Sequence, residues 1–94
     1  MFKKRRGIHI PYNEQGLIYF VCMNVKKMPV EVQNKVLNLC IEVAGQDYKA
    51  LYEVMTNDNK SILSISLEYF INEKRLYKMR KEFYEKWSNT KGTP

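Results

Sequence analysis

The sequence predicts an all-α fold of about five helices in a single domain. Apolar residues recur every three to four positions through most of the chain, and no segment keeps the two-residue alternation of a half-buried strand. Apolar residues make up 45% of the 94 residues, which is enough to fill one packed core. No apolar run approaches the roughly 18 residues of a membrane span, and polar residues interrupt the start too early for a signal peptide. We therefore expect a cytoplasmic location.

The first half of the chain reads as a basic arm followed by two helices. The arm covers 1–10, and Pro11 suits the first turn of a helix because its missing N–H has no partner there. The apolar spacing predicts helices over 12–27 and 29–44. Gly45 follows directly and can take the left-handed conformation that ends many helices.

Three further helices are predicted in the second half, each with a polar residue at its start. Asp47 can cap a helix over 47–55, Ser61 one over 62–70, and Asn72 one over 73–87. The polar residues after this helix, 89–94, are expected to form a frayed tail.

The composition offers little for catalysis, so we expect no enzyme activity and no cofactor. His9 is the one histidine, and no CxxC or HxxxH spacing exists for a metal. Cys22 and Cys40 each lie within an apolar run and are interpreted as reduced core thiols. No nucleophile and base pair, and no phosphate-binding glycine loop, accompanies them.

Residues 62–81 carry the most informative pattern. Its apolar side chains stand at offsets 0, +4, +6, +11 and +14, and they are Ile65, Tyr69, Ile71, Leu76 and Met79. Two helices that cross steeply through a short turn bury side chains at these offsets. Ser66 is small where the second helix passes closest. The same pattern also fits ordinary packing in a helical bundle.

Residues 65–80, ISLEYFINEKRLYKMR, resemble the helix-turn-helix of small bacterial and phage DNA-binding proteins. The step Leu76-Tyr77-Lys78 is similar to one in the DNA-binding helices of insertion-sequence transposases. The residue before Ile71 is commonly glycine in such proteins and is Phe70 here, where a positive φ is costly. The resemblance implies a tri-helical unit over 46–88, preceded by a pair of helices over 11–45.

The distribution of charge favours the DNA-binding interpretation over the simple bundle. The net charge is +6. Positions 1–6 carry four cations, and 74–86 carry six cations and two anions, whereas 7–73 carry five cations and eight anions. The positive charge is therefore concentrated on the arm and on the helix that the motif assigns to DNA reading.

The predicted function is sequence-specific binding of double-stranded DNA by a transcriptional regulator or a phage or mobile-element protein. The helix over 73–87 is expected in the major groove, with Asn72, Tyr77 and Lys78 at base edges. Phosphate contacts are expected from Lys74, Arg75 and Lys81. The arm is either a minor-groove contact or a solvated tail, and its cations are Lys3, Lys4, Arg5 and Arg6.

The N-terminal helices either enlarge the core or form a homodimer interface that would match a palindromic site. Their candidate interface residues are Phe20, Val21, Met23, Val36 and Leu39. Two other functions stay open. One is a small helical protein-interaction module or inhibitor without a nucleic-acid role. The other is single-strand or RNA binding, in which Tyr77 and Tyr84 stack on bases.

Overall fold

The computed structural model of the chain describes the backbone of residues 10–91 and the side chains of 10–88. The predicted all-α class is confirmed, because this part of the chain contains helices and no strand. The arm predicted over 1–10 lies outside the described residues except for Ile10. The elements in chain order are α1 (Tyr12–Met23), the 3₁₀ turn η1 (Val25–Lys27), α2 (Val30–Ala44), the 3₁₀ turn η2 (Gly45–Asp47), α3 (Tyr48–Thr56), α4 (Ile62–Tyr69) and α5 (Glu73–Lys91).

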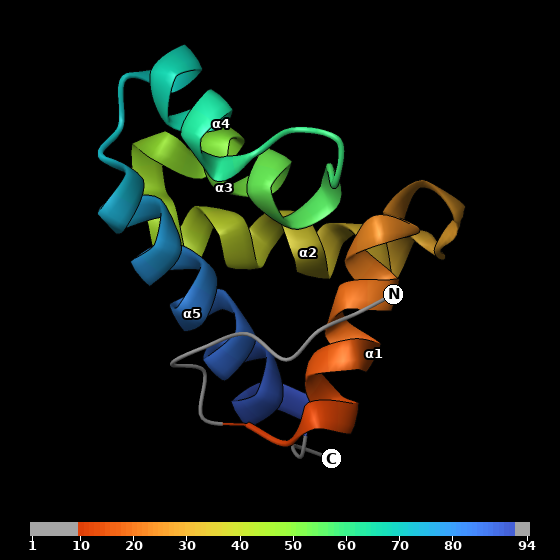
Figure 1. Cartoon of the computed structure of the whole chain (residues 1–94). Coiled ribbons are helices and arrows are strands. Elements are labelled where there is room, and N and C mark those ends of the chain that lie inside the picture. Colours follow the sequence, from red (N-terminus) through yellow and green to blue (C-terminus); the bar gives the residue numbers. More distant parts are fainter. Residues whose placement is uncertain (1–9, 92–94) are drawn as a thin grey trace.

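The core lies among α2, α3 and α5, which pack on one another (Figure 1). The other two helices cover it, with α1 on α3 and α5, and α4 on the same pair. The largest fully buried side chains come from all five α-helices and include Ile18, Val36, Leu51, Ile65 and Phe83.

Both thiols lie in this core, as the sequence predicts. Cys22 and Cys40 are free and fully buried. Burial raises the pKa of Cys40 to about 12 and raises that of Cys22 still more, with the neighbouring Cys40 adding to the effect. Both groups therefore stay protonated and act as small apolar side chains.

The first helix ends earlier than the apolar spacing indicated. The α-helical backbone stops at Met23, and the chain turns through η1 before α2 begins. Asn24 favours this end because its side-chain Nδ2 donates to the carbonyl of Phe20, 2.8 Å away. Met28 is extended with ψ 158°, as a residue before Pro29 usually is, so a helix could not continue through it.

The connection between α2 and α3 departs from two expectations. Gly45 has the positive φ expected, 58°, but its ψ of −121° lies outside the left-handed helical region. Asp47 was expected to cap the third helix, and it makes no such bond. The reason is local: η2 leads directly into α3, so Asp47 has φ −94° and ψ 17° instead of the extended backbone of a cap.

The frayed tail predicted over 89–94 is wrong for its first part, because α5 continues to Lys91. Two side chains just before this segment fix the helix to the rest of the molecule. Trp87 is buried, and Ser88 Oγ donates to Oε1 of Glu14, 2.6 Å away. Tertiary contacts with α1 thus override the weak helix propensity of this polar segment.

Candidate nucleic-acid interface

The turn between α4 and α5 is three residues long and is defined by hydrogen bonds. Phe70 takes the left-handed conformation, with φ 57° and ψ 44°. The amide of Ile71 then donates to the carbonyl of Ser66, 3.1 Å away, and Ser66 Oγ donates back to the carbonyl of Ile71 at 2.6 Å. This reciprocal pair fixes where α4 ends and how the chain turns toward α5.

Both helices of this unit begin at the predicted caps. Ser61 Oγ accepts from the amide of Ser64 at 3.0 Å, and Asn72 Oδ1 accepts from the amide of Lys74 at 2.8 Å. Each side chain satisfies a backbone donor that the first helical turn leaves open.

The apolar side chains that defined the pattern face the core. Ile65, Ile71, Leu76 and Met79 are all buried. Tyr69 is half-buried against the same core, and its hydroxyl reaches out of it to the carboxylate of Glu53 on α3. The spacing therefore identified the inner face of both helices.

A polar cluster ties α4 to α3 around that carboxylate. The Tyr69 hydroxyl donates to Oε2 of Glu53, and Lys60 Nζ lies 3.0 Å from Glu53 Oε1 and 2.8 Å from Glu68 Oε1. The hydrogen bonds that Glu53 accepts from Tyr69 and from Lys60 lower its pKa, and the bond from Tyr69 has the larger effect. The bond to Glu53 raises the pKa of Tyr69 to about 12. Glu53 is thus held ionised and Tyr69 protonated at neutral pH.

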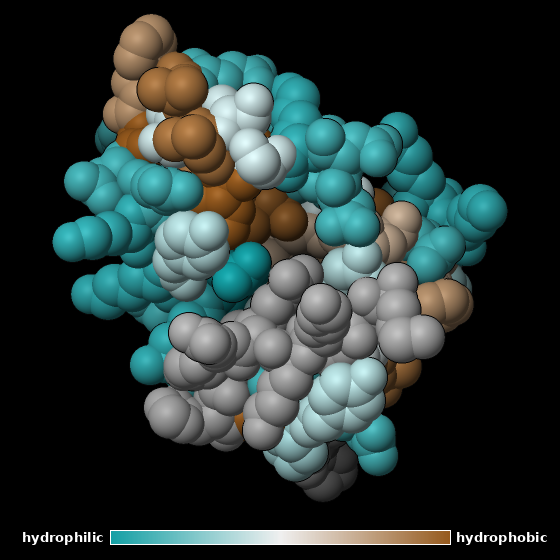
Figure 2. All heavy atoms as spheres, viewed as in Figure 1, coloured by the Kyte–Doolittle hydropathy of each residue, from teal (hydrophilic) through white to brown (hydrophobic). Residues whose placement is uncertain are grey.

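The outer side of the first half of α5 carries the predicted contact residues. Asn72, Lys74, Arg75, Tyr77 and Lys78 are exposed, and Lys81 is half-buried. Hydrophilic side chains project along this edge of the molecule (Figure 2). Within the described side chains, no ion pair joins Lys74, Lys78 or Lys81 to a carboxylate. Lys3, Lys4, Arg5 and Arg6 lie outside the described residues.

Arg75 and Tyr77 have neighbours that the sequence did not indicate. Arg75 Nη1 lies 2.5 Å from Oδ2 of Asp47 in η2, so part of its guanidinium is already engaged. The guanidinium of Arg80 lies 5.1 Å from the centre of the Tyr77 ring. This contact holds the phenol of Tyr77 on the side of α5 that carries Lys74, Lys78 and Lys81.

The other aromatic residues of α5 belong to the core. Phe83, Tyr84 and Trp87 are buried, with Phe83 and Trp87 ring centres 6.0 Å apart. The ammonium of Lys35 lies 4.2 Å from the Trp87 ring centre. Tyr84 is 1% exposed and is therefore inaccessible to nucleic-acid bases, while Tyr77 is 46% exposed.

The residues predicted to form a dimer interface on the N-terminal helices also include both buried and exposed side chains. Val36 and Leu39 are buried core residues. Val21 and Met23 are half-buried, and Phe20 is 57% exposed. The core alternative therefore holds for the two α2 residues, and Phe20 is the most exposed of the five.

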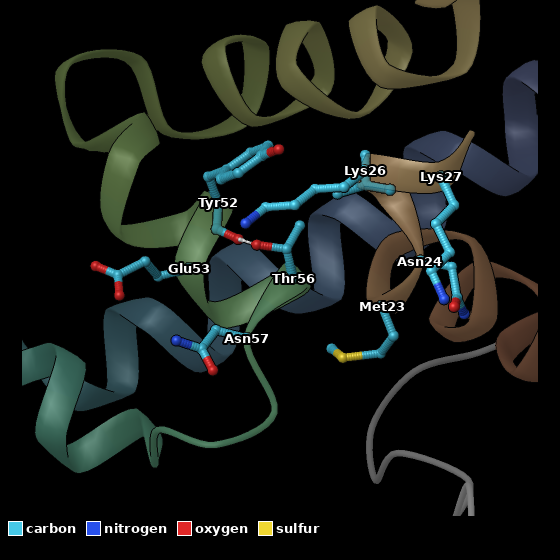
Figure 3. Close-up of a pocket in the computed structure, with 9 residues that line it drawn as sticks. Met23, Asn24, Lys26, Lys27, Tyr52, Glu53, Thr56 and Asn57 are labelled. Atoms are coloured by element: carbon cyan, nitrogen blue, oxygen red, sulfur yellow. Dashed lines mark hydrogen bonds between the residues drawn. The ribbon is translucent and has the colours of Figure 1, made fainter. Parts of the chain in front are cut away.

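The sequence did not predict a cavity between η1 and the end of α3. It has a volume of about 550 Å3, and the side chain of Lys26 extends across it from η1 toward the end of α3 (Figure 3). Tyr52 and Thr56 line the side formed by α3, where Thr56 Oγ1 donates to the Tyr52 carbonyl at 2.7 Å. Burial raises the pKa of Tyr52. The early end of α1 opens this space. Because the sequence predicts one continuous helix over 12–27, the cavity could not be predicted from it.

Neither a metal site nor a membrane-spanning helix is found in the part of the chain that the structure describes. No three histidine, cysteine, aspartate or glutamate side chains there are grouped to hold an ion. No helix within 10–91 combines the length and the apolar character needed to cross a bilayer. Comparison with protein-family models, curated proteins and solved structures gives no match.

Proposed function

We propose that this protein binds double-stranded DNA, with α4 and α5 acting as a helix-turn-helix and α5 entering the major groove. One observation carries the proposal. The first half of α5 buries Leu76 and Met79 and leaves Lys74, Tyr77 and Lys78 exposed directly after a three-residue turn. A cytoplasmic transcriptional regulator, or a DNA-binding protein of a phage or mobile element, uses such a surface without catalysis.

The dimensions of this surface fit a major groove. Lys74, Lys78 and Lys81 stand four and three residues apart, so they follow one side of the helix. At 1.5 Å per residue they span roughly 10 Å, close to the major-groove width of about 12 Å. Lys74 and Lys81 at the ends suit phosphates, and Lys78 between them suits a guanine edge.

The remaining residues add polar contacts around these cations. Asn72 caps the helix through Oδ1, which leaves its Nδ2 donors for a base or a phosphate. Tyr77 presents its hydroxyl beside Lys78 as a second base-edge contact. Arg75 retains donors beyond the one that meets Asp47, and these can reach phosphate.

The test begins with selection of bound sequences from a random duplex pool, followed by titration of the selected site by fluorescence anisotropy. We expect Lys78→Ala to weaken binding to that site roughly ten- to hundredfold, the loss of about 1–3 kcal/mol that one base contact represents. Binding to unrelated duplex should fall much less. Lys74→Ala should weaken both equally and reduce the salt slope by about 1.

Lys86→Ala is the matched control, because it removes the same charge from the same helix. Lys86 pairs with Glu42 at 3.1 Å and lies on a later turn. It should change site affinity by less than Lys78→Ala does. The proposal fails if no sequence is enriched, or if Lys78→Ala and Lys86→Ala bind the selected site equally.

A protein-interaction module without a nucleic-acid role is the second candidate. The exposed apolar side chains of α4, Leu63 and Leu67, favour it. Such a module predicts no binding to duplex DNA or single-stranded RNA that weakens as salt is raised. Titration of both nucleic acids at two salt concentrations separates the two functions.

A further inference from the structure

The outward face of α4 carries a row of exposed apolar side chains, here called the α4 stripe, made of Leu63, Leu67 and Phe70. Their exposed fractions are 53%, 68% and 94%. They stand four and three residues apart, so they lie along one side of the helix and its end. Apolar groups project at this corner of the molecule, at the upper left of Figure 2.

The backbone at Phe70 makes the exposure of its ring more informative. A left-handed conformation is costly for any residue with a side chain, and glycine relieves that cost. The ring is nearly fully exposed, so it gains no burial within the described molecule. The left-handed backbone serves the α4–α5 turn of the single copy, whereas the ring makes no use of burial there, and a large exposed ring at this position points to a contact made outside the single copy.

The electrostatics of this face limit what can cover it. Glu68 is the one charged residue within α4, and Lys60 already pairs with it at 2.8 Å. The polar residues beside the stripe, Ser61 and Ser64, are neutral. A nucleic acid requires a basic surface, which this face lacks. A second copy of the chain meets no like charge here, although each copy carries a net +6.

The area also agrees with a pair of copies. With about 200 Å2 for a large side chain, the exposed fractions correspond to roughly 400 Å2 of apolar surface per copy. Two such faces amount to roughly 800 Å2 of apolar surface, which is below the roughly 1,200 Å2 of stable specific interfaces and is typical of weak, reversible association. In an antiparallel pair of α4 helices, Leu67 lies near the two-fold axis and Phe70 reaches Leu63 of the second copy.

We propose that two copies of this chain associate through the α4 stripe as a two-fold, reversible dimer. The stripe is on α4 and the proposed DNA contacts are on α5. The proposed dimer therefore does not require DNA. This face differs from the one that the sequence suggested on the N-terminal helices.

Sedimentation velocity of the full chain without nucleic acid tests the proposal. Over a concentration range of about 1 to 500 µM, we expect a monomer–dimer equilibrium with a dissociation constant in the micromolar range. Phe70→Ala should raise this constant at least tenfold, because each substitution removes a contact on both copies. Phe70→Gly should do the same while removing the backbone strain, so loss of folding cannot explain its effect.

Phe20→Ala is the matched control, since it removes an exposed ring from α1. It should leave the dissociation constant within twofold of the unmodified chain. A chain that stays monomeric over the whole range overturns the proposal, as does a dimer that resists both Phe70 variants or is weakened by Phe20→Ala instead. A chain that binds selected DNA but never dimerises refutes the α4 interface and leaves the proposed function standing.

Discussion

The left-handed residue in the α4–α5 turn allows a direct test of its backbone energetics. Phe70 has φ 57° and is 94% exposed, so Phe70→Gly changes the backbone cost and removes almost no buried surface. Relief of the left-handed conformation should stabilise the fold by about 1–2 kcal/mol. The greater freedom of glycine in the unfolded chain offsets about 0.4–1 kcal/mol of this. The expected net gain is about 0.5–1 kcal/mol, or roughly 2–8 °C in Tm.

Thermal unfolding followed by circular dichroism measures this gain at a protein concentration below the proposed dimer range. Phe70→Ala is the control, because alanine loses the ring and keeps the backbone cost. Its Tm should stay close to that of the unmodified chain, within about 0.5 kcal/mol of stability. If Phe70→Gly lowers the Tm, or if both variants shift it equally, the ring contributes to the isolated fold and the reasoning is refuted.

Two further substitutions test the contacts that hold α4. Ser66→Ala removes the hydroxyl that donates to the Ile71 carbonyl and should destabilise the fold by about 0.5–1.5 kcal/mol in urea unfolding, whereas Ser64→Ala, exposed on the same helix, should be close to neutral. Tyr69→Phe should lower the Tm most between about pH 5 and 9. The Glu53 pKa is lowered, so the stabilisation that ionised Glu53 contributes is lost as the pH falls below the ordinary glutamate range. The Tyr69 pKa is raised to about 12, so the stabilisation that the protonated Tyr69 hydroxyl contributes is lost as the pH rises from about 10 toward that value. A Tm difference that stays constant from acid to alkaline pH contradicts this account.

The inner face of the α4–α5 unit could be predicted from the sequence because local spacing determines it. Ile65, Ile71, Leu76 and Met79 are buried, and Asn72 caps α5. Helix periodicity and capping depend on neighbours within a few residues, so the sequence contains both directly. The exposed side of α5 follows from the same periodicity.

Contacts between distant parts of the chain could not be predicted in this way. Arg75 meets Asp47 across 28 positions, and no spacing along the sequence indicates that the two residues pair. The cavity beside Lys26 is lined by η1 and by the end of α3, which are far apart in the sequence. Such features follow from how whole helices are packed, and a single sequence has no local pattern for them.

The hydrogen bond between Glu14 and Ser88 joins residues 74 positions apart, and it has a consequence for synthesis of the protein. A ribosome makes α1 first, yet α1 packs on α3 and α5. The first helix must therefore wait, without its final partner, until the last helix has emerged. Closure of this side is then a late folding step, because contacts between such distant residues form slowly.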